Sequence, residues 1–170
     1  MTDDPAMMDE AIAEDADTGY LQARVQVAGI ELIADEPVSV GGQGTGPSPY
    51  QLMAAALASC TTLTLRLYAT HKGWPVRRIR TAVGHVRTDD AKRPSRFTRC
   101  IEIDGDLDDL QRARMIVIAE KCPVHRLLVG GAQIRTLASN APPPTQPAID
   151  HVVDMEALIA VGRGSFDFAR

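Results

Sequence analysis

Cys122 and His125 are the two residues of this chain whose types and spacing point most directly to chemistry. They stand three residues apart around a proline, in the run CPVHRLL. Proline is favoured in the first turn of a helix, so Cys122 is expected at a helix N-terminus, where unpaired N–H groups stabilise a thiolate. His125 could add positive charge or act as a base. A purely structural interpretation, in which Cys122 only caps the helix and His125 lies on the surface, stays open.

The other two cysteines stand in more ordinary surroundings. Cys60 lies within a segment that has no charged residue from Leu52 to Thr64. Such a segment is typical of a helix buried in a core or between subunits. Taken alone, a cysteine there is most often a small buried hydrophobe. Cys100 is interpreted as a structural cysteine on a strand.

Other site chemistries find little support in the sequence. Cys122 and His125 supply two metal ligands where a structural zinc site needs about four, so no metal is expected. No G-x-S-x-G motif occurs, and Ser48 is explained as a helix cap. The glycine-rich residues 41–46 lack the GK[ST] ending of a phosphate-binding loop, and they are interpreted as a flexible connection. No cofactor is expected.

Composition narrows the class of protein. The chain has 170 residues, 45% hydrophobic and 24% charged, which suits a globular protein with one core. Seven acids lie in the first 17 residues, and the basic residues beyond them are dispersed, so no nucleic-acid partner is expected. The longest apolar run, residues 52–58, is far below the roughly 20 residues of a membrane span. With three cysteines and no export signal, the predicted compartment is the cytoplasm.

The charge pattern and the prolines predict three parts. Residues 1–18 are expected to be a disordered acidic tail, residues 19–140 the folded domain, and residues 141–170 a proline-rich linker followed by a short C-terminal helix. Within the domain we expect strands at 21–27, 30–34 and 36–40, a long helix, strands at 76–87 and 97–103, a second helix, and a strand at 132–137.

Capping signals set the expected helix starts. Ser48, Pro49 and Gln51 form an S-x-x-Q capping box with proline at the first helical position, which predicts a helix from Pro49 to about Tyr68. Asp106 is the expected cap of the second helix. The predicted order βββαββαβ is that of an α+β fold. The arginines of the second strand pair, Arg99 among them, are expected on a solvated face.

Three segments together resemble the OsmC/Ohr family, in its less characterised OsmC-like branch. They are GTGPSPYQLMAAALASCT (residues 44–61), YATHKGWPV (68–76) and AEKCPVHRLL (119–128). The resemblance covers about residues 21–137. It implies the family's fold with a long buried central helix, in an intertwined homodimer with the sites at the interface.

The resemblance also implies an activity. It is that of a thiol-dependent peroxide reductase in oxidative stress defence, with Cys60 as the peroxidatic and Cys122 as the resolving cysteine. The implied partners are an organic hydroperoxide and a small dithiol reductant. From the residues alone, Cys122 is the more acidic thiol, and the resemblance overrides that ranking.

The sequence departs from the family at two activating residues. Characterised members have an arginine before the central helix and a glutamate just after its first proline. Here Tyr50 stands at the glutamate position, and no Lys or Arg occurs between Arg24 and Arg66. Arg24, Tyr50 and His125 are the candidates to bind substrate or thiolate in their place.

Two functions from different classes remain open. One is the two-cysteine hydroperoxide reductase, which the presence of both Cys60 and Cys122 favours. The other is a non-enzymatic dimeric module that binds a small hydrophobic ligand, or a redox sensor. The missing arginine and glutamate favour the second.

Overall fold

The computed structural model describes residues 10–138, 143 and 150–161. The chain forms two compact units, the first from residues 1–53 and 134–150 and the second from residues 54–133 and 151–170. The division into a folded domain at residues 19–140 with a tail and a linker stays a prediction. The linker prolines, apart from Pro143, and residues 1–9 of the predicted tail lie outside the described residues.

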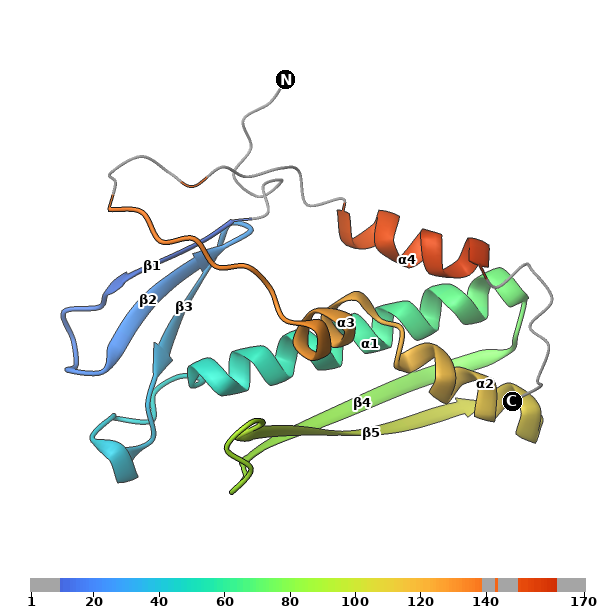
Figure 1. Ribbon diagram of the computed structural model, residues 1–170, viewed down its shortest axis with the longest axis horizontal. Helices are drawn as coiled ribbons and strands as arrows, with labels where there is room; N and C mark the ends of the chain where they lie inside the picture. The colour runs from blue at the N-terminus through green and yellow to red at the C-terminus, as the bar shows by residue number, and fades with distance from the viewer. Residues whose placement is uncertain (1–9, 139–142, 144–149, 162–170) are drawn as a thin grey trace. The chain divides into compact units, whose positions relative to one another are not determined.

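The α+β class is confirmed, and the elements are labelled in Figure 1. In chain order they are β1 (Ala11–Asp15), β2 (Gln22–Val27), β3 (Ile30–Asp35), α1 (Pro49–Lys72), β4 (Val76–Arg87), β5 (Ser95–Gly105), α2 (Asp109–Ala119), α3 (Pro123–Gly130) and α4 (Asp150–Val161).

An antiparallel sheet in the order β1-β2-β3 forms the first unit. The predicted hairpin of β2 and β3 is present, and Ala28 and Gly29 turn it with φ of 49° and 73°. Strand β1 lies within the segment expected to be disordered, so that expectation is wrong for residues 11–15. Glu14 of β1 lies opposite Arg24 of β2 in the register and forms an ion pair with it at 3.2 Å. A local sequence pattern does not show such a cross-strand contact.

The loop after β3 is more ordered than its sequence indicates. The strand expected at 36–40 is instead a 3₁₀ turn at Val38–Val40, because Pro37 fixes φ and lacks an N–H to donate. Residues 41–46 then close around the buried Asp35 carboxylate, which accepts the Thr45 N–H at 2.9 Å and the Thr45 hydroxyl at 2.8 Å. The Thr45 N–H is the main cause that holds the pKa of Asp35 well below its usual range.

Helix α1 begins at its predicted capping box. Ser48 N–H donates to Gln51 Oε1 at 2.8 Å, and Gln51 N–H donates to Ser48 Oγ at 3.4 Å. The buried positions of the helix recur at three- and four-residue spacing and make one face: Ala54, Leu57, Cys60, Thr61, Thr64, Leu65, Tyr68 and Ala69. The helix is therefore not covered on every side, and Leu63 is 53% exposed.

The second unit packs α1 and α2 against the β4–β5 hairpin. Leu65 and Tyr68 of α1 meet Met115 and Ile118 of α2 in one buried cluster. Figure 1 shows α1 running along the length of the hairpin. Among the described residues α1 alone is long and apolar enough to cross a membrane by length and composition. Its contacts are those of a core helix.

Two further expectations on the second half of the chain are corrected. Helix α2 is capped by Asp108 rather than Asp106, because Asp108 forms a reciprocal capping box with Gln111. The strand expected at 132–137 is absent, and residues 131–138 have no regular structure. Its apolar Ile134 is 91% exposed, so no neighbouring strand covers it. The observed order is βββαββααα.

Replacing Gly46 by alanine is expected to destabilise the protein. A Cβ at this position would lie 1.8 Å from the carbonyl oxygen of Ile33, which belongs to the backbone of β3 and cannot move freely. Overpacking of this kind costs about 1–3 kcal/mol of unfolding free energy. Gly84 in β4 is the control, because a Cβ there meets nothing within 4 Å. Urea unfolding of both variants tests the argument, and equal stabilities for Gly46→Ala and Gly84→Ala would contradict it.

Candidate thiol site

Cys60 and Cys122 lie in one buried cluster of the second unit. They are 3% and 0% exposed, and both are free thiols. Leu57 completes the cluster, which is covered by Val83, Phe97, Val124 and Leu128. Cys100, by contrast, is an exposed thiol on β5. The fold therefore brings together the two cysteines that stand 62 positions apart and leaves the third outside.

The N-terminus of α3 holds both sulfurs. Cys122 is the N-cap of this helix and Pro123 its first residue, as the CPV run predicts. Val124 N–H donates to Cys60 Sγ at 3.4 Å, and His125 N–H donates to Cys122 Sγ at 3.4 Å. Two successive backbone donors that a helix start leaves unpaired are thus divided between the two thiols.

Arg99 of β5 supplies a cation that sequence analysis did not assign to the site. Its Nη1 donates to Thr61 Oγ1 at 2.8 Å and to the Ala119 carbonyl at 2.9 Å, and it lies 4.0 Å from Cys122 Sγ. The expectation of a solvated face is wrong for this arginine. The alternation of Arg99 with Phe97 and Ile101 along the strand indicates that Arg99 faces the packed side of β5, because alternate residues share one face of a sheet.

The two thiols differ in acidity. A hydrogen bond from Cys60, the N–H of His125, the Thr61 hydroxyl and the charge of Arg99 together lower the pKa of Cys122 to about 5 against the opposing effect of burial. The neighbouring Cys122 and burial raise the pKa of Cys60 above its usual range. The first negative charge of the pair is therefore held at Cys122, in agreement with the ranking from helix position.

A histidine from α4 contacts the Cys60 sulfur. His151 Nε2 lies 3.0 Å from Cys60 Sγ, within the second unit. One turn later on the same helix, Met155 is 6% exposed. Sequence analysis missed His151, since nothing in its neighbourhood indicates that the helix beyond the prolines returns to Cys60.

Two hollows open beside the cysteine cluster. The larger has a volume of about 760 Å³ and the smaller about 400 Å³, and Leu57, Phe97 and His125 line both. The His125 side chain thus stands at the surface next to the cluster, while its backbone N–H serves Cys122. The larger hollow also has basic residues on its wall: Lys92, Arg93 and Arg96.

Arg24 and Tyr50 belong to the first unit. Arg24 pairs with Glu14 at 3.2 Å and with Glu31 at 3.7 Å across its own sheet. Tyr50 is 46% exposed near the start of α1. Their roles at the thiols stay predictions. In the described part of the chain, no group of three or more His, Cys, Asp or Glu side chains could hold a metal ion.

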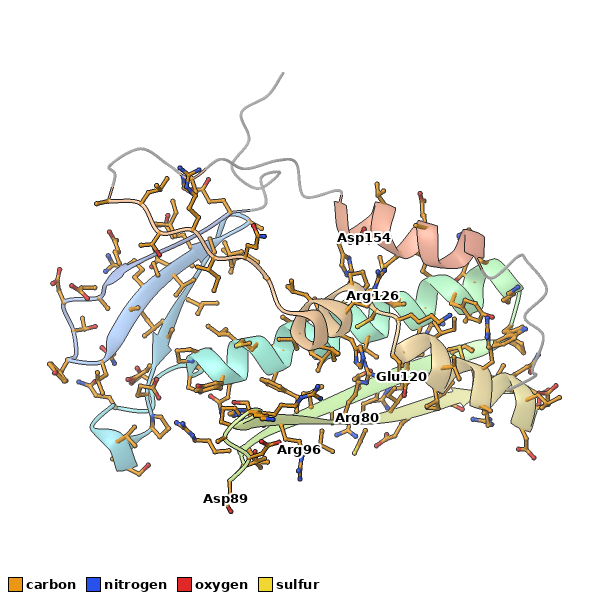
Figure 2. The ribbon with its side chains drawn as sticks, in the orientation of Figure 1. Arg80, Asp89, Arg96, Glu120, Arg126 and Asp154 are labelled. Atoms are coloured by element: carbon orange, nitrogen blue, oxygen red, sulfur yellow. The ribbon has the colours of Figure 1, made fainter. Side chains whose placement is uncertain are left out.

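Removal of the Arg99 charge is expected to raise the pKa of Cys122 by about 1, since a nearby opposite charge favours the ionised form by about 1–3. Less thiolate would then be present at mildly acidic pH. Ultraviolet absorbance of the thiolate, titrated with acid, measures the effect in Arg99→Gln. Arg99→Lys keeps the charge. Arg80→Gln alters an exposed arginine, labelled in Figure 2, which forms an ion pair with Glu102. Identical titrations of Arg99→Gln and Arg80→Gln would refute the role of the charge.

Solved structures with a similar fold include three bacterial proteins. A protein described as an osmotic stress-induced and detoxification response protein from Psychrobacter arcticus is 26% identical, with a TM-score of 0.58, over 68% of this chain and 85% of that one. An OsmC-like protein from Mycoplasma pneumoniae is 20% identical, with a TM-score of 0.60, over 71% and 86%.

The third, an organic hydroperoxide resistance protein from Legionella pneumophila, is 20% identical, with a TM-score of 0.56, over 71% and 88% of the two chains. A search of curated proteins finds no match. The model of the family described as OsmC-like protein matches residues 42–136, more than half of the 170 residues, and includes both buried cysteines. The chain therefore belongs to the OsmC-like protein family.

Proposed function

We propose that this chain is a thiol-dependent peroxidase that reduces organic hydroperoxides in oxidative stress defence. The observation that carries the proposal is the pair of free cysteines, Cys60 and Cys122, which lie in one buried cluster and accept hydrogen bonds from neighbouring N–H groups of α3. A lone buried cysteine packs as a hydrophobe. Two thiols in contact, one with a pKa of about 5, have the parts of a redox couple.

The first step is attack by Cys60. Its thiolate sulfur bonds to the terminal oxygen of the hydroperoxide and the O–O bond breaks, so that Cys60 becomes a sulfenic acid and the leaving alkoxide takes a proton to become an alcohol. The peroxide is reduced by two electrons and the sulfur is oxidised by two.

The second step joins the two cysteines. The Cys122 thiolate attacks the sulfur of the Cys60 sulfenic acid, the S–O bond breaks as the S–S bond forms, and the leaving hydroxide takes a proton from solvent to become water. Arg99 and His125 N–H favour the thiolate of Cys122, which is the form that attacks. A small dithiol then reduces the disulfide, as a reducing cytoplasm allows. Because Cys122 contacts Cys60, the sulfenic acid is trapped before further oxidation.

The surroundings of the pair favour an organic substrate. Leu57 and Phe97, which pack on the cysteines, also line the two hollows beside them. An apolar wall binds the carbon part of an organic hydroperoxide and offers little to hydrogen peroxide. One family member of similar fold is named an organic hydroperoxide resistance protein, which agrees with this choice.

The second candidate function is a non-enzymatic module that binds a small hydrophobic ligand, or a redox sensor. The hollow of about 760 Å³ and the near-complete burial of both thiols favour it. Tyr50 stands where characterised family members have a glutamate, and this departure also favours the non-enzymatic function. The same peroxide assay separates the two functions.

The Cys60→Ser variant is expected to lose turnover of cumene hydroperoxide with dithiothreitol by at least about a hundredfold, because the serine hydroxyl cannot be oxidised in place of the thiol. Cys100→Ser is the matched control, since Cys100 is exposed and outside the cluster. Loss of hydroperoxide is followed by a ferrous-ion colour assay. A wild-type protein without turnover, or Cys60→Ser with full turnover, would reject the enzyme and leave the ligand-binding module.

We further propose that the protein is a homodimer, because α1 exposes the apolar side chains of Met53 and Leu63 outside its buried face. Sedimentation at micromolar concentration is expected to give about twice the 18.3 kDa chain mass. The Leu63→Arg variant should shift the protein toward the monomer, and Thr70→Arg, at another exposed position of α1, should not. A folded wild-type monomer at these concentrations would contradict the proposal.

A further inference from the structure

The C-terminal helix α4 adds a residue to the thiol site that the matched family region does not contain. That region ends at residue 136, and His151 lies 15 positions beyond it. Its Nε2 is 3.0 Å from Cys60 Sγ, which is hydrogen-bonding distance for a thiol and an imidazole. The Val124 N–H lies farther from the same sulfur, at 3.4 Å.

A positioned helix carries this histidine. Met155 follows His151 by four residues, so the two side chains share a face of α4. Met155 is buried and His151 is half-buried, so this face is directed into the second unit. The histidine is therefore held at the sulfur by packing one turn further along the helix.

Cys60 needs such a partner more than Cys122 does. The pKa of Cys60 is raised, first by the neighbouring Cys122 and then by burial, so its proton is held firmly. Arg99 and the N–H of His125 favour the anion of Cys122 instead. A nucleophile that is hard to ionise requires an adjacent base that accepts its proton when substrate is present.

Resting on the peroxidase function proposed above, we propose that His151 is the acid–base catalyst of Cys60. Neutral His151 takes the thiol proton at Nε2 and leaves a thiolate beside an imidazolium. When the thiolate attacks the hydroperoxide and the O–O bond breaks, the imidazolium returns that proton to the alkoxide. The products are the Cys60 sulfenic acid, an alcohol and neutral His151, so no outside proton source is needed.

Other ionisable groups stand on the elements that contact the two cysteines and on α4. They are Cys122 and His125 on α3, Arg99 on β5 and Asp154 on α4 itself. None of these side chains is recorded at the Cys60 sulfur except Cys122, so His151 is the described titratable nitrogen in contact with it.

The first test measures Cys60 without any peroxide. The full-length protein is alkylated with iodoacetamide across a pH series, and the Cys60 peptide is quantified by mass spectrometry. Loss of the imidazolium in His151→Gln removes a charge that stabilises the Cys60 thiolate. The alkylation profile is expected to move to higher pH, with about a tenfold lower rate near neutral pH. His71→Gln, at an exposed position in the last turn of α1, is expected to keep the wild-type profile.

The second test separates proton transfer from helix docking. Turnover of cumene hydroperoxide is expected to fall about a hundredfold in His151→Ala, the usual contribution of a general acid–base group. Free imidazole added to His151→Ala should restore part of this activity. Met155→Ala, which loosens the docking of α4 and keeps the imidazole, should lose activity without rescue by added imidazole.

The outcomes also distinguish this inference from the function on which it rests. An unchanged Cys60 profile and full turnover in His151→Gln would overturn the role of His151 and leave the peroxidase intact. Loss of activity in His151→Ala without imidazole rescue would reduce His151 to a docking residue and overturn the inference. A wild-type protein that consumes no hydroperoxide but keeps a His151-dependent Cys60 profile would overturn the peroxidase and support the pair.

Discussion

The division of two backbone N–H groups between two sulfurs is the interaction on which the site depends. Val124 N–H serves Cys60 and His125 N–H serves Cys122, each at 3.4 Å. Both donors exist because α3 starts at Pro123, directly after the cysteine that caps it. A helix start elsewhere would leave the sulfurs without these donors. The break between α2 and α3 is therefore as much a part of the site as the cysteines themselves.

Burial makes the charges around the sulfurs interdependent. A buried anion is costly unless it has hydrogen-bond donors and an opposite charge near it. The pair meets this requirement with polar groups from four elements: Cys60 and Thr61 on α1, Arg99 on β5, the N–H groups of α3 and His151 on α4. Each element also belongs to the core of the second unit. The stability of the unit and the ionisation of its thiols are consequently set by the same contacts.

The sequence was informative where the structure is set by near neighbours along the chain. The capping box of Ser48 and Gln51, the span of α1 and the cap at Cys122 all follow from residues within a few positions. It was uninformative where distant segments pair. Strand β1 exists because Glu14 and its neighbours pair with β2, and the strand expected at 132–137 finds no partner.

The two site residues that sequence analysis missed are Arg99 and His151, and they differ in whether a local pattern could have revealed them. Arg99 could have been found, because its alternation with Phe97 and Ile101 already places it on the packed side of β5. An arginine on such a face must find acceptors, and it finds the Thr61 hydroxyl and the Ala119 carbonyl beside Cys122. His151 could not have been found, because the position of α4 depends on packing through Met155 that no local pattern predicts. The departures from the family near α1 therefore do not leave the thiols without cationic or basic groups. These groups are Arg99 of β5 and His151 of α4, and both follow Cys60 in the sequence.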